Sequence, residues 1–413
     1  MAALGQLEKL PESVRDSKLR AAFRYDGHQQ YVVHPRGLRG RLEQKEDVWI
    51  RIKTIGAGGN GSVDLQCRES PRTGLPTQLR AVKNIRIPEA ELISNRDFYV
   101  RELEAIAKFS SLRYGDLFVK SLGWFTSEDT IHIAMEYCKL GDLQMFLFDK
   151  CPGHRLPEDQ TREIASQVLE AISCMHEEYF AHRDIKPANI LIQSHPPESP
   201  WVVKLADFGI SRRSLGHEMN STTTRRGTPV FWPPELHGFV TSDSEGYGNL
   251  YATDMWCFGE TLFRVLTGQA TFGNVAKLSN FAFGQIDFPE AILKDLSVSD
   301  GGVAFLRSLI VCNPRDRLTA LDALEHPWFD QDIPNSYWEQ PSTPLTDIAN
   351  ATDLPYLHQE TTGPSAVWPT RSSLEDIGTS SIKAFNKGRA TNSRRLGNNG
   401  PYDSFGFVAY GAL

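Results

Sequence analysis

The sequence is poor in cysteine. Its six cysteines are scattered among 413 residues, and no C-x-x-C pair occurs. This pattern excludes a disulfide framework of the kind found in small secreted domains, and it excludes a cysteine-ligated zinc site. It predicts buried or partly buried thiols in a reducing compartment. We therefore expect an intracellular protein.

Long apolar runs and an excess of positive charge are also missing. No stretch of about 18 apolar residues is available to span a bilayer. The first ten residues lack the continuous apolar segment of a secretory signal. The formal net charge of −7 gives no electrostatic basis for binding nucleic acid or an anionic membrane. These absences favour a cytoplasmic and/or nuclear protein without a membrane span or a nucleic-acid partner.

Internal repeats are absent, and the length indicates more than one compact part. A chain of 413 residues exceeds the usual size of one domain, so two lobes or domains with tails are expected. Residues 1–47 are mixed and polar, apart from a β-prone patch at 30–33, and are predicted to form a weakly ordered extension. A folded domain is predicted over 48–329. Residues 330–413 are rich in Pro, Ser, Thr, Asn and Gly, and are predicted to be disordered or loosely docked.

A glycine-rich stretch lies between two alternating segments. Apolar and polar residues alternate over 50–52 and over 63–67, as in half-buried strands. A dinucleotide-binding turn would need a helix directly after the glycines, and the alternation disfavours it. A glycine-rich hairpin lets backbone N–H groups close over phosphates, although a merely flexible hairpin remains an alternative. The candidate phosphate-binding residues are Ile55, Gly56, Gly58, Gly61 and Val63.

A lysine follows in the next predicted strand, residues 79–85. A lone lysine in a strand usually faces solvent, but Lys83 comes shortly after the glycine stretch. A lysine that binds phosphate needs a carboxylate to hold its ammonium group. A helix predicted over 97–109 offers two candidates, Glu102 and Glu104.

The most specific stretch is A-H-R-D-I-K-P-A-N at residues 181–189, followed by D-F-G at 207–209. Asp184 can accept a proton from a hydroxyl group. Asn189 and Asp207 offer hard oxygen ligands to a small divalent cation. Phosphoryl transfer needs such a set, because the nucleophile must be positioned and the charge growing on the phosphate oxygens must be neutralised.

This string resembles the catalytic core of protein kinases, and the resemblance extends over residues 49–329. It implies an α+β bilobal fold, with a small antiparallel β N-lobe carrying one main helix (48–137) and a larger, mainly α-helical C-lobe (138–329). It implies ATP and Mg²⁺ as cofactors, and proteins as substrates. Tyrosine kinases typically carry A-A-R in place of the segment at Lys186, so the implied acceptors are Ser and Thr.

The same resemblance assigns roles to single residues. Lys83 would hold the α- and β-phosphates, and Glu102, the first Glu of R-E-L-E, would be its partner, with Glu104 as the alternative. Asp184 would orient the substrate hydroxyl and take its proton, while Lys186 would bridge the γ-phosphate. The metal ligands would be Asn189 and Asp207.

The hinge between the lobes is implied where a strand ends before a helix. Met135 would border the adenine pocket, and backbone groups of Glu136 and Cys138 would bond the adenine edge. Asp142 could reach the ribose, and Ala81 from the preceding strand completes the nucleotide-binding set. An ordinary strand end and turn is the alternative interpretation.

The polar residues 211–226 resemble an activation segment. Thr224 lies three residues before Gly227, and a phosphate on it could pair with Arg183 in a charge-assisted, bidentate contact. An upstream activating kinase is therefore a candidate partner. Further along, Thr228 is expected to contact the catalytic residues. Two structural contacts are also expected: Glu235 with Arg317, and Asp254 with the catalytic loop.

Two alternatives share the fold. A pseudokinase or scaffold would bind partners without catalysis, but pseudokinases typically lose the lysine, the loop aspartate or the D-F-G aspartate, and all three are present here. A small-molecule kinase would usually lack the G-T-P…P-E segment and its arginine partner. The sequence therefore predicts an ATP-dependent protein serine/threonine kinase.

Overall fold

A computed structural model describes residues 10–25, 30–36, 45–58, 61–69, 76–87, 96–110, 112–127, 129–208, 212–213, 227–240 and 250–330. The chain divides into two units, 1–333 with 410–413 and 334–409, and all described residues belong to the first. The predicted C-terminal tail, the tip of the glycine stretch, Gly209 and Thr224 lie outside these residues.

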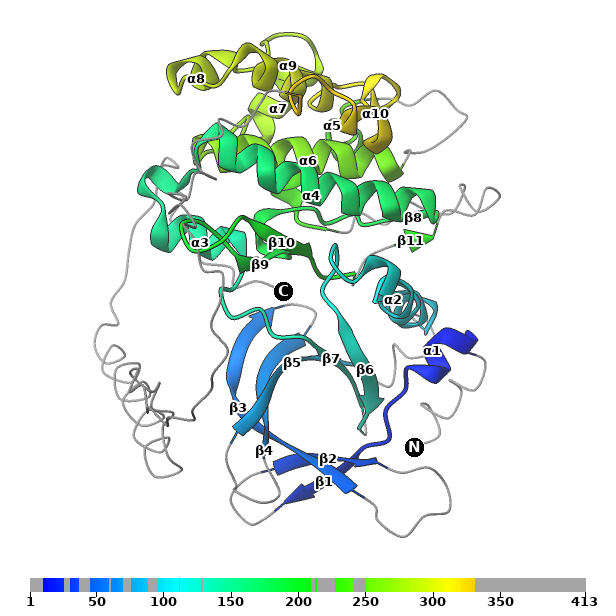
Figure 1. The fold of residues 1–413 in the computed structure, drawn as a ribbon. Helices are drawn as coiled ribbons and strands as arrows, with labels where there is room; N and C mark the ends of the chain where they lie inside the picture. The colour runs from blue at the N-terminus through cyan, green and yellow to red at the C-terminus, as the bar shows by residue number, and fades with distance from the viewer. Residues whose placement is uncertain are drawn as a thin grey trace, which may run out of the picture. The chain divides into compact units, whose positions relative to one another are not determined.

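The N-lobe is a curled antiparallel sheet with the strand order β1-β2-β3-β4-β5-β7-β6 (Figure 1). The alternating segments of the sequence form two of its long strands, in which Leu65 and Cys67 face the interior, whereas Ile52 is 41% exposed. The strands are β1 (Ala22–Tyr25), β2 (Gln30–Arg36), β3 (Lys45–Gly58), β4 (Gly61–Glu69), β5 (Pro76–Arg86), β6 (Ser121–Thr126) and β7 (Thr130–Met135).

The described part of the extension belongs to this lobe, where we had expected weak order. β2 pairs with β3 from Tyr31↔Ile50 to Arg36↔Lys45, so the sheet begins well before residue 48. Val32 and Val33 are buried, and α1 (Glu12–Asp16) precedes the first strand. The β-prone patch is thus a sheet strand, because the pairing surface of β3 satisfies its backbone groups.

The main N-lobe helix, α2 (Arg96–Phe109), matches the helix predicted over 97–109 within one residue. Its apolar residues at helical spacing are buried, among them Leu103, Ile106 and Phe109. Glu102 lies on the same helix and is only 3% exposed. The helix therefore carries a buried carboxylate towards the sheet.

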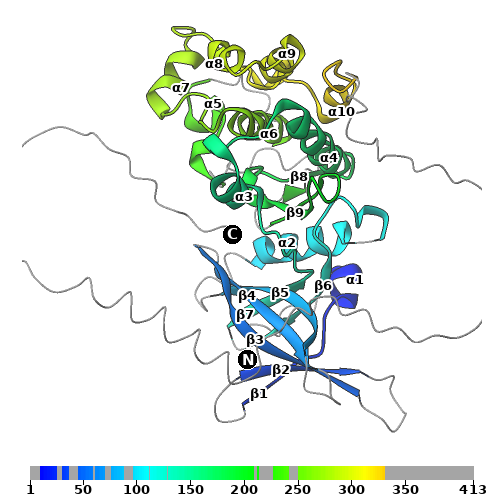
Figure 2. The same ribbon diagram turned by 60° about the vertical axis from the view of Figure 1, so that its left-hand side comes forward.

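The C-lobe is mainly helical, with α4 (Glu158–Glu177) and α6 (Leu250–Thr267) at its centre (Figures 1 and 2). One face of α4, including Ile164, Val168 and Ile172, is buried, and nearly every residue of α6 is buried. The other helices are α3 (Leu143–Lys150), α5 (Pro234–His237), α7 (Val275–Ala282), α8 (Glu290–Asp295), α9 (Asp300–Leu309) and α10 (Ala320–Leu324). Short 3₁₀ turns lie at Leu112–Tyr114, Pro152–His154, Pro187–Asn189, Pro229–Phe231 and Pro314–Asp316.

Two small antiparallel strand pairs lie in the C-lobe. β9 (Ile190–Ser194) pairs with β10 (Val202–Leu205), and a proline-rich loop joins them. β8 (Phe180–Ala181) pairs with β11 (Arg212–Arg213). β8 leads into the 181–189 loop and β9 follows it, while residue 207 comes shortly after β10. In the described residues, no helix has the length and apolarity needed to cross a membrane.

Candidate active site

Asp254 of α6 holds the 181–189 loop in place through hydrogen bonds. This fully buried carboxylate accepts the backbone N–H of His182 (2.8 Å) and of Arg183 (2.6 Å). His176 Nε2 lies within hydrogen-bonding distance of the same carboxylate, at 2.9 Å. Arg183 has a φ of +71°, an uncommon backbone conformation for a residue with a side chain. The two bonds to Asp254 stabilise that conformation, as the sequence predicted for this aspartate.

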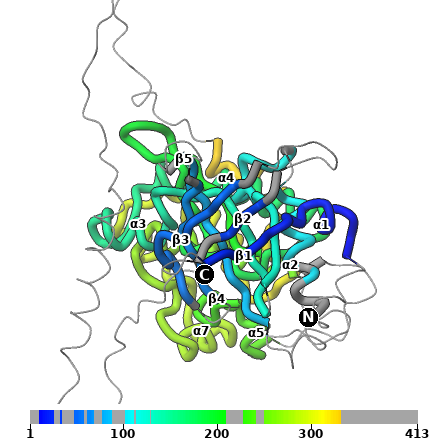
Figure 3. The backbone as a smooth tube through the Cα atoms, turned by 90° about the horizontal axis from the view of Figure 1, so that it is seen from below, coloured from blue at the N-terminus to red at the C-terminus, as the bar shows by residue number. Residues whose placement is uncertain are grey.

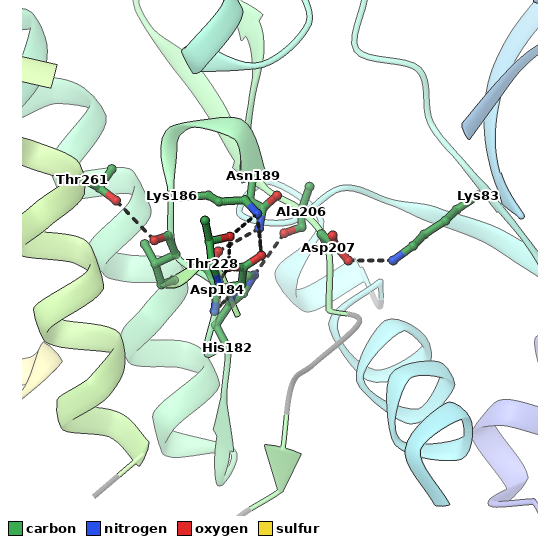
Figure 4. A network of polar contacts seen from close by, with 10 residues as sticks. Lys83, His182, Asp184, Lys186, Asn189, Ala206, Asp207, Thr228 and Thr261 are labelled. Carbon is green, nitrogen blue, oxygen red and sulfur yellow. Dashed lines mark hydrogen bonds and ion pairs between the residues drawn. The ribbon is translucent and has the colours of Figure 1, made fainter. Parts of the chain in front are cut away.

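Asp184 is bonded through both carboxylate oxygens (Figure 4). Its Oδ1 accepts the backbone N–H (3.0 Å) and the hydroxyl (2.8 Å) of Thr228. Its Oδ2 accepts from Lys186 Nζ at 2.7 Å and from Asn189 Nδ2 at 3.2 Å. Lys186 Nζ also donates to Thr228 Oγ1 at 2.7 Å. The orientation of this carboxylate is therefore determined by three side chains from two segments.

Lys83 bridges the two lobes. Its Nζ donates to Glu102 Oε1 at 2.9 Å. It also donates to Asp207 Oδ1 at 2.7 Å, the contact drawn in Figure 4. The partner proposed from the sequence, Glu102, is thus the one that binds, while Glu104 is not needed for this contact. Burial acts to lower the pKa of Lys83, but the charges of Asp207 and Glu102 outweigh it and raise the pKa above its ordinary value. The ammonium stays charged beside two carboxylates.

Asp207 has a φ of +65°, and Phe208 after it is buried among residues of both lobes. The Phe208 ring lies 5.9 Å from the His182 ring and 5.6 Å from the Phe118 ring. His182 Nε2 donates to the carbonyl oxygen of Ala206 at 3.0 Å. These contacts of His182 and Phe208 link the two motifs so that Asp207 faces Lys83.

The glycine stretch forms the predicted hairpin. Gly56 pairs with Val63 and Gly58 with Gly61, across the β3–β4 turn, and Ile55 is 40% exposed. Gly61 has a φ of +133°, and a Cβ there would lie 1.9 Å from the carbonyl oxygen of Asn84. A side chain at this position would push β4 away from β5, so only glycine keeps the hairpin over the strand that carries the site lysine.

An apolar cluster lies beside the predicted hinge. Cys138, Ala206 and Val119 are buried together, with Met135 and Leu191 packed against them. Burial first, then the charge of Glu136, raises the pKa of the Cys138 thiol to about 11. Ala81, which pairs with Met135 across β5 and β7, is buried next to this cluster.

Two hinge carboxylates have contacts that the sequence did not reveal. Glu136 Oε1 accepts from the Lys120 backbone N–H (2.8 Å) and Lys204 Nζ (2.6 Å), and Gln193 Nε2 donates to its Oε2 (3.1 Å). Asp142 caps α3 by accepting the Met145 N–H at 2.9 Å, which gives it a structural role. Its contact with a ribose stays a prediction. The glycine-then-Asp pattern before a helix could have indicated the cap.

The metal-binding prediction is consistent with the chemistry of the site. The amide nitrogen of Asn189 donates to the backbone carbonyl oxygen of Asp184 at 2.7 Å. Its amide oxygen is therefore the atom suited to a cation. Lys83 contributes one positive charge to the site, whereas the Glu102 and Asp207 carboxylates contribute two negative charges. A divalent cation would offset the remaining negative charge. In the described part of the chain no three His, Cys, Asp or Glu side chains form a metal cage by themselves. Mg²⁺ suits such a site, because it takes one or two protein ligands with phosphates and water.

Other predicted contacts of the C-lobe are confirmed. Arg317 donates to both oxygens of Glu235, each at 2.7 Å. The predicted contacts of Thr228 with the catalytic-loop residues Asp184 and Lys186 are also present.

The sequence matches the family described as protein kinase domain over residues 49–329. Serine/threonine-protein kinase RAD53 of Saccharomyces cerevisiae is 32% identical over 249 residues, which are 59% of this chain and 29% of that protein. Serine/threonine-protein kinase Nek1 of Toxoplasma gondii is 29% identical over 289 residues, 67% of this chain and 17% of that protein. Mitogen-activated protein kinase kinase kinase 5 of Arabidopsis thaliana is 28% identical over 300 residues, 72% of this chain and 38% of that protein.

The aligned part of the chain spans less than two fifths of the length of each of these three relatives. The family match itself covers more than half of the chain and contains every residue of the candidate site. Fold, site geometry and sequence agree, and the chain belongs to the protein kinase family.

Proposed function

We propose that this chain is a protein serine/threonine kinase that transfers the γ-phosphate of MgATP to hydroxyl groups of protein substrates. One observation carries the proposal. Lys83 is bonded to both Glu102 and Asp207, while Asp184 is bonded to Thr228 and Lys186, an arrangement that supports phosphoryl transfer to a hydroxyl group. The bonded lysine and the complete catalytic loop argue against a pseudokinase.

The chemistry follows from the bonds to Asp184. Four hydrogen bonds from Thr228, Lys186 and Asn189 fix the direction in which this carboxylate points. Phosphoryl transfer of this kind passes through a loose transition state, so positioning of the hydroxyl matters more than early proton removal. Asp184 would orient the hydroxyl and take its proton late. Lys186, bonded to the same carboxylate, would lie beside the transferred phosphoryl group.

The nucleotide groups would bind along the bridge between the lobes. Lys83 would contact the α- and β-phosphates under the glycine hairpin, and the cluster around Cys138 would take the adenine. Asn189 and Asp207 would hold Mg²⁺, which would neutralise charge on the phosphate oxygens. The acceptor class follows from Lys186, whose contact with Thr228 matches the serine/threonine pattern.

A phosphotransfer assay tests this proposal. The full chain is incubated with labelled MgATP and myelin basic protein as a generic acceptor, beside the Asp184→Asn variant. We expect phosphoserine and phosphothreonine with the wild type, and a loss of roughly 10² to 10⁴-fold in rate with Asp184→Asn. Binding of MgATP without transfer by the wild type would indicate a pseudokinase, and predominant phosphotyrosine would contradict the acceptor class.

Regulation and location are further parts of the proposal. Arg183, adjacent to the catalytic Asp184, supports phosphorylation of Thr224 as an activating step, carried out by the kinase itself or by an upstream kinase. Thr224→Ala should then lower activity, and full activity in that variant would refute the idea. The free cysteines and the net charge of −7 support a cytoplasmic or nuclear location, which microscopy of the tagged full chain would test.

A further inference from the structure

The helix that carries Glu102, α2, packs against a segment that lies outside the region matching the kinase family. Among the described helices and strands, α2 shares its largest contact with α1 and its next largest with β6. Figures 1 to 3 all show α1 beside α2. α1 comprises residues 12–16, whereas the family match begins at residue 49.

The contact between α1 and α2 is apolar and shielded from solvent. Val14 is fully buried and Leu10 is 6% exposed, although the rest of α1 faces solvent. Both belong to the cluster that contains Leu103 and Phe109 of α2. Burial of such apolar side chains is favourable, so α1 contributes to the surface on which α2 packs.

The residues after α1 are bonded to β6, the other neighbour of α2. Trp124 donates its indole N–H to the Val14 carbonyl at 2.8 Å and its backbone N–H to the Ser17 carbonyl at 3.2 Å. The backbone N–H of Leu19 donates to the Trp124 carbonyl at 2.7 Å. The chain then continues into β1 at the far edge of the same sheet. Residues 10–19 therefore connect α2, β6 and the opposite edge of the sheet.

Gly123 shows how closely this segment is fitted. Its φ is +111°, and a Cβ built there would lie 2.7 Å from both the Leu19 side chain and the Ser17 carbonyl oxygen. A glycine at this point lets residues 17–19 lie directly on β6. Any side chain would have to displace them.

We propose that residues 10–19, the N-terminal brace, position α2 so that Glu102 reaches Lys83, and that Val14 is its central positioning residue. The Lys83–Glu102 distance of 2.9 Å depends on where α2 lies, and α1 is the element against which α2 packs most. A shift of α2 by about 1 Å would break this bond and misplace the phosphate-binding lysine. The brace thereby makes an element outside the matched domain a determinant of catalytic rate, an inference that rests on the proposed kinase activity.

The experiment uses the full chain with two perturbing variants and two matched controls. Val14→Asp removes the apolar contact of α1, and Gly123→Ala displaces residues 17–19. Ser13→Ala changes an exposed residue of α1, and Gly284→Ala changes a glycine that also has a positive φ but no atom within 4 Å of its Cβ position. Two quantities are measured for each: kcat/KM with MgATP and myelin basic protein, and amide hydrogen exchange in α2, α4 and α6.

We expect both perturbing variants to lower kcat/KM by roughly tenfold or more and to speed exchange in α2, with α4 and α6 still protected. The controls should stay within about twofold of the wild type, since their sites make no such contact. If Val14→Asp unfolds the whole chain, the Gly123→Ala variant tests the proposal instead. Unchanged α2 exchange in a folded perturbing variant would overturn the proposal.

A double-mutant cycle separates positioning from general loss of stability. If the brace acts through Glu102, Val14→Asp should change kcat/KM by less than about twofold in a Glu102→Gln background. An equal factor in both backgrounds would refute a role through Glu102. A wild type without phosphotransfer would refute the proposed function instead, while hydrogen exchange in α2 would still test the brace.

Discussion

At the scale of single residues, Thr228 connects the catalytic loop to the segment that follows the activation segment. Its hydroxyl donates to Asp184 and accepts from Lys186, so it lies between the proposed base and the lysine proposed to contact the γ-phosphate. We predict that Thr228→Ala lowers kcat/KM by roughly 10 to 100-fold, because Asp184 loses one of the bonds that orient it. Steady-state kinetics measure the effect.

Thr228→Ser is the matched control for this prediction. It keeps the hydroxyl and should keep most of the activity. Both variants should unfold at a denaturant concentration close to that of the wild type, because Thr228 is only half-buried. Equal activity of the alanine and serine variants would contradict the positioning role.

His132 on β7 makes the N-lobe sensitive to acid. Mainly through burial, its pKa is lowered from 6.5 to about 4. Asn84 Oδ1 lies 2.8 Å from its Nδ1 and Ser127 Oγ 2.8 Å from its Nε2, and the Phe125 ring stacks on it at 4.8 Å. Asp64 acts to raise the pKa but does not outweigh burial. The folded state therefore holds this ring neutral.

The sign of the resulting pH dependence follows from proton binding. Between pH 6.5 and about 4 the unfolded chain binds a proton at His132 that the folded chain does not, so stability is lost as the pH falls through this window. The shift corresponds to up to about 3 kcal/mol. Urea unfolding at pH 7 and pH 4.5 should show that the wild type loses more stability than His132→Gln. Equal losses of stability in the wild type and in His132→Gln would contradict this role of His132.

At the scale of elements, one ion pair joins the α5 segment to the turn before α10. The Arg317 side chain is fully buried and Glu235 is 8% exposed, and Arg317 also donates to the carbonyl oxygens of Val311 and Ala252. Removing the arginine leaves a buried carboxylate without its cation. We predict that Arg317→Met lowers the free energy of unfolding by about 3–5 kcal/mol.

The exposed pair between Arg307 and Glu290 supplies the comparison. Arg307 is 60% exposed in that pair, so Arg307→Met should change the free energy of unfolding by no more than about 1 kcal/mol. Both values come from chemical denaturation followed by tryptophan fluorescence. Similar costs for the two substitutions would show that burial does not determine the strength of these pairs here.

At the scale of the whole molecule, the predictable parts were those encoded in short strings. The loop around Asp184, the glycine hairpin and helix α2 follow from local patterns, since backbone preference and periodicity act over a few residues. The structure also confirms the long-range pairing of Glu235 with Arg317, which the family resemblance supplied.

Other features could not be predicted, because they depend on surfaces that meet only in the folded chain. β1 has four residues of which Phe23 is half-buried and the next two are exposed, too short a pattern to indicate a strand. The contact of Val14 with α2 and the bond between Glu136 and Lys204 each join segments more than 60 residues apart. A sequence pattern does not specify which of many apolar or charged partners such a residue meets.

The position of the site between the two lobes leads to a last prediction, about ligand binding and stability. Lys83 comes from the sheet and Asp207 from the C-lobe, so MgATP would contact both lobes at once. A ligand that binds only the folded state at 100 times its Kd stabilises it by about 2.7 kcal/mol. MgATP should therefore raise the Tm of the full chain by a few degrees, an effect that EDTA reduces. Asp207→Asn should lose the dependence on Mg²⁺, whereas Thr228→Ser should retain it. A Tm that MgATP does not change in the wild type would mean that the lysine–carboxylate bridge only holds the lobes together and binds no nucleotide.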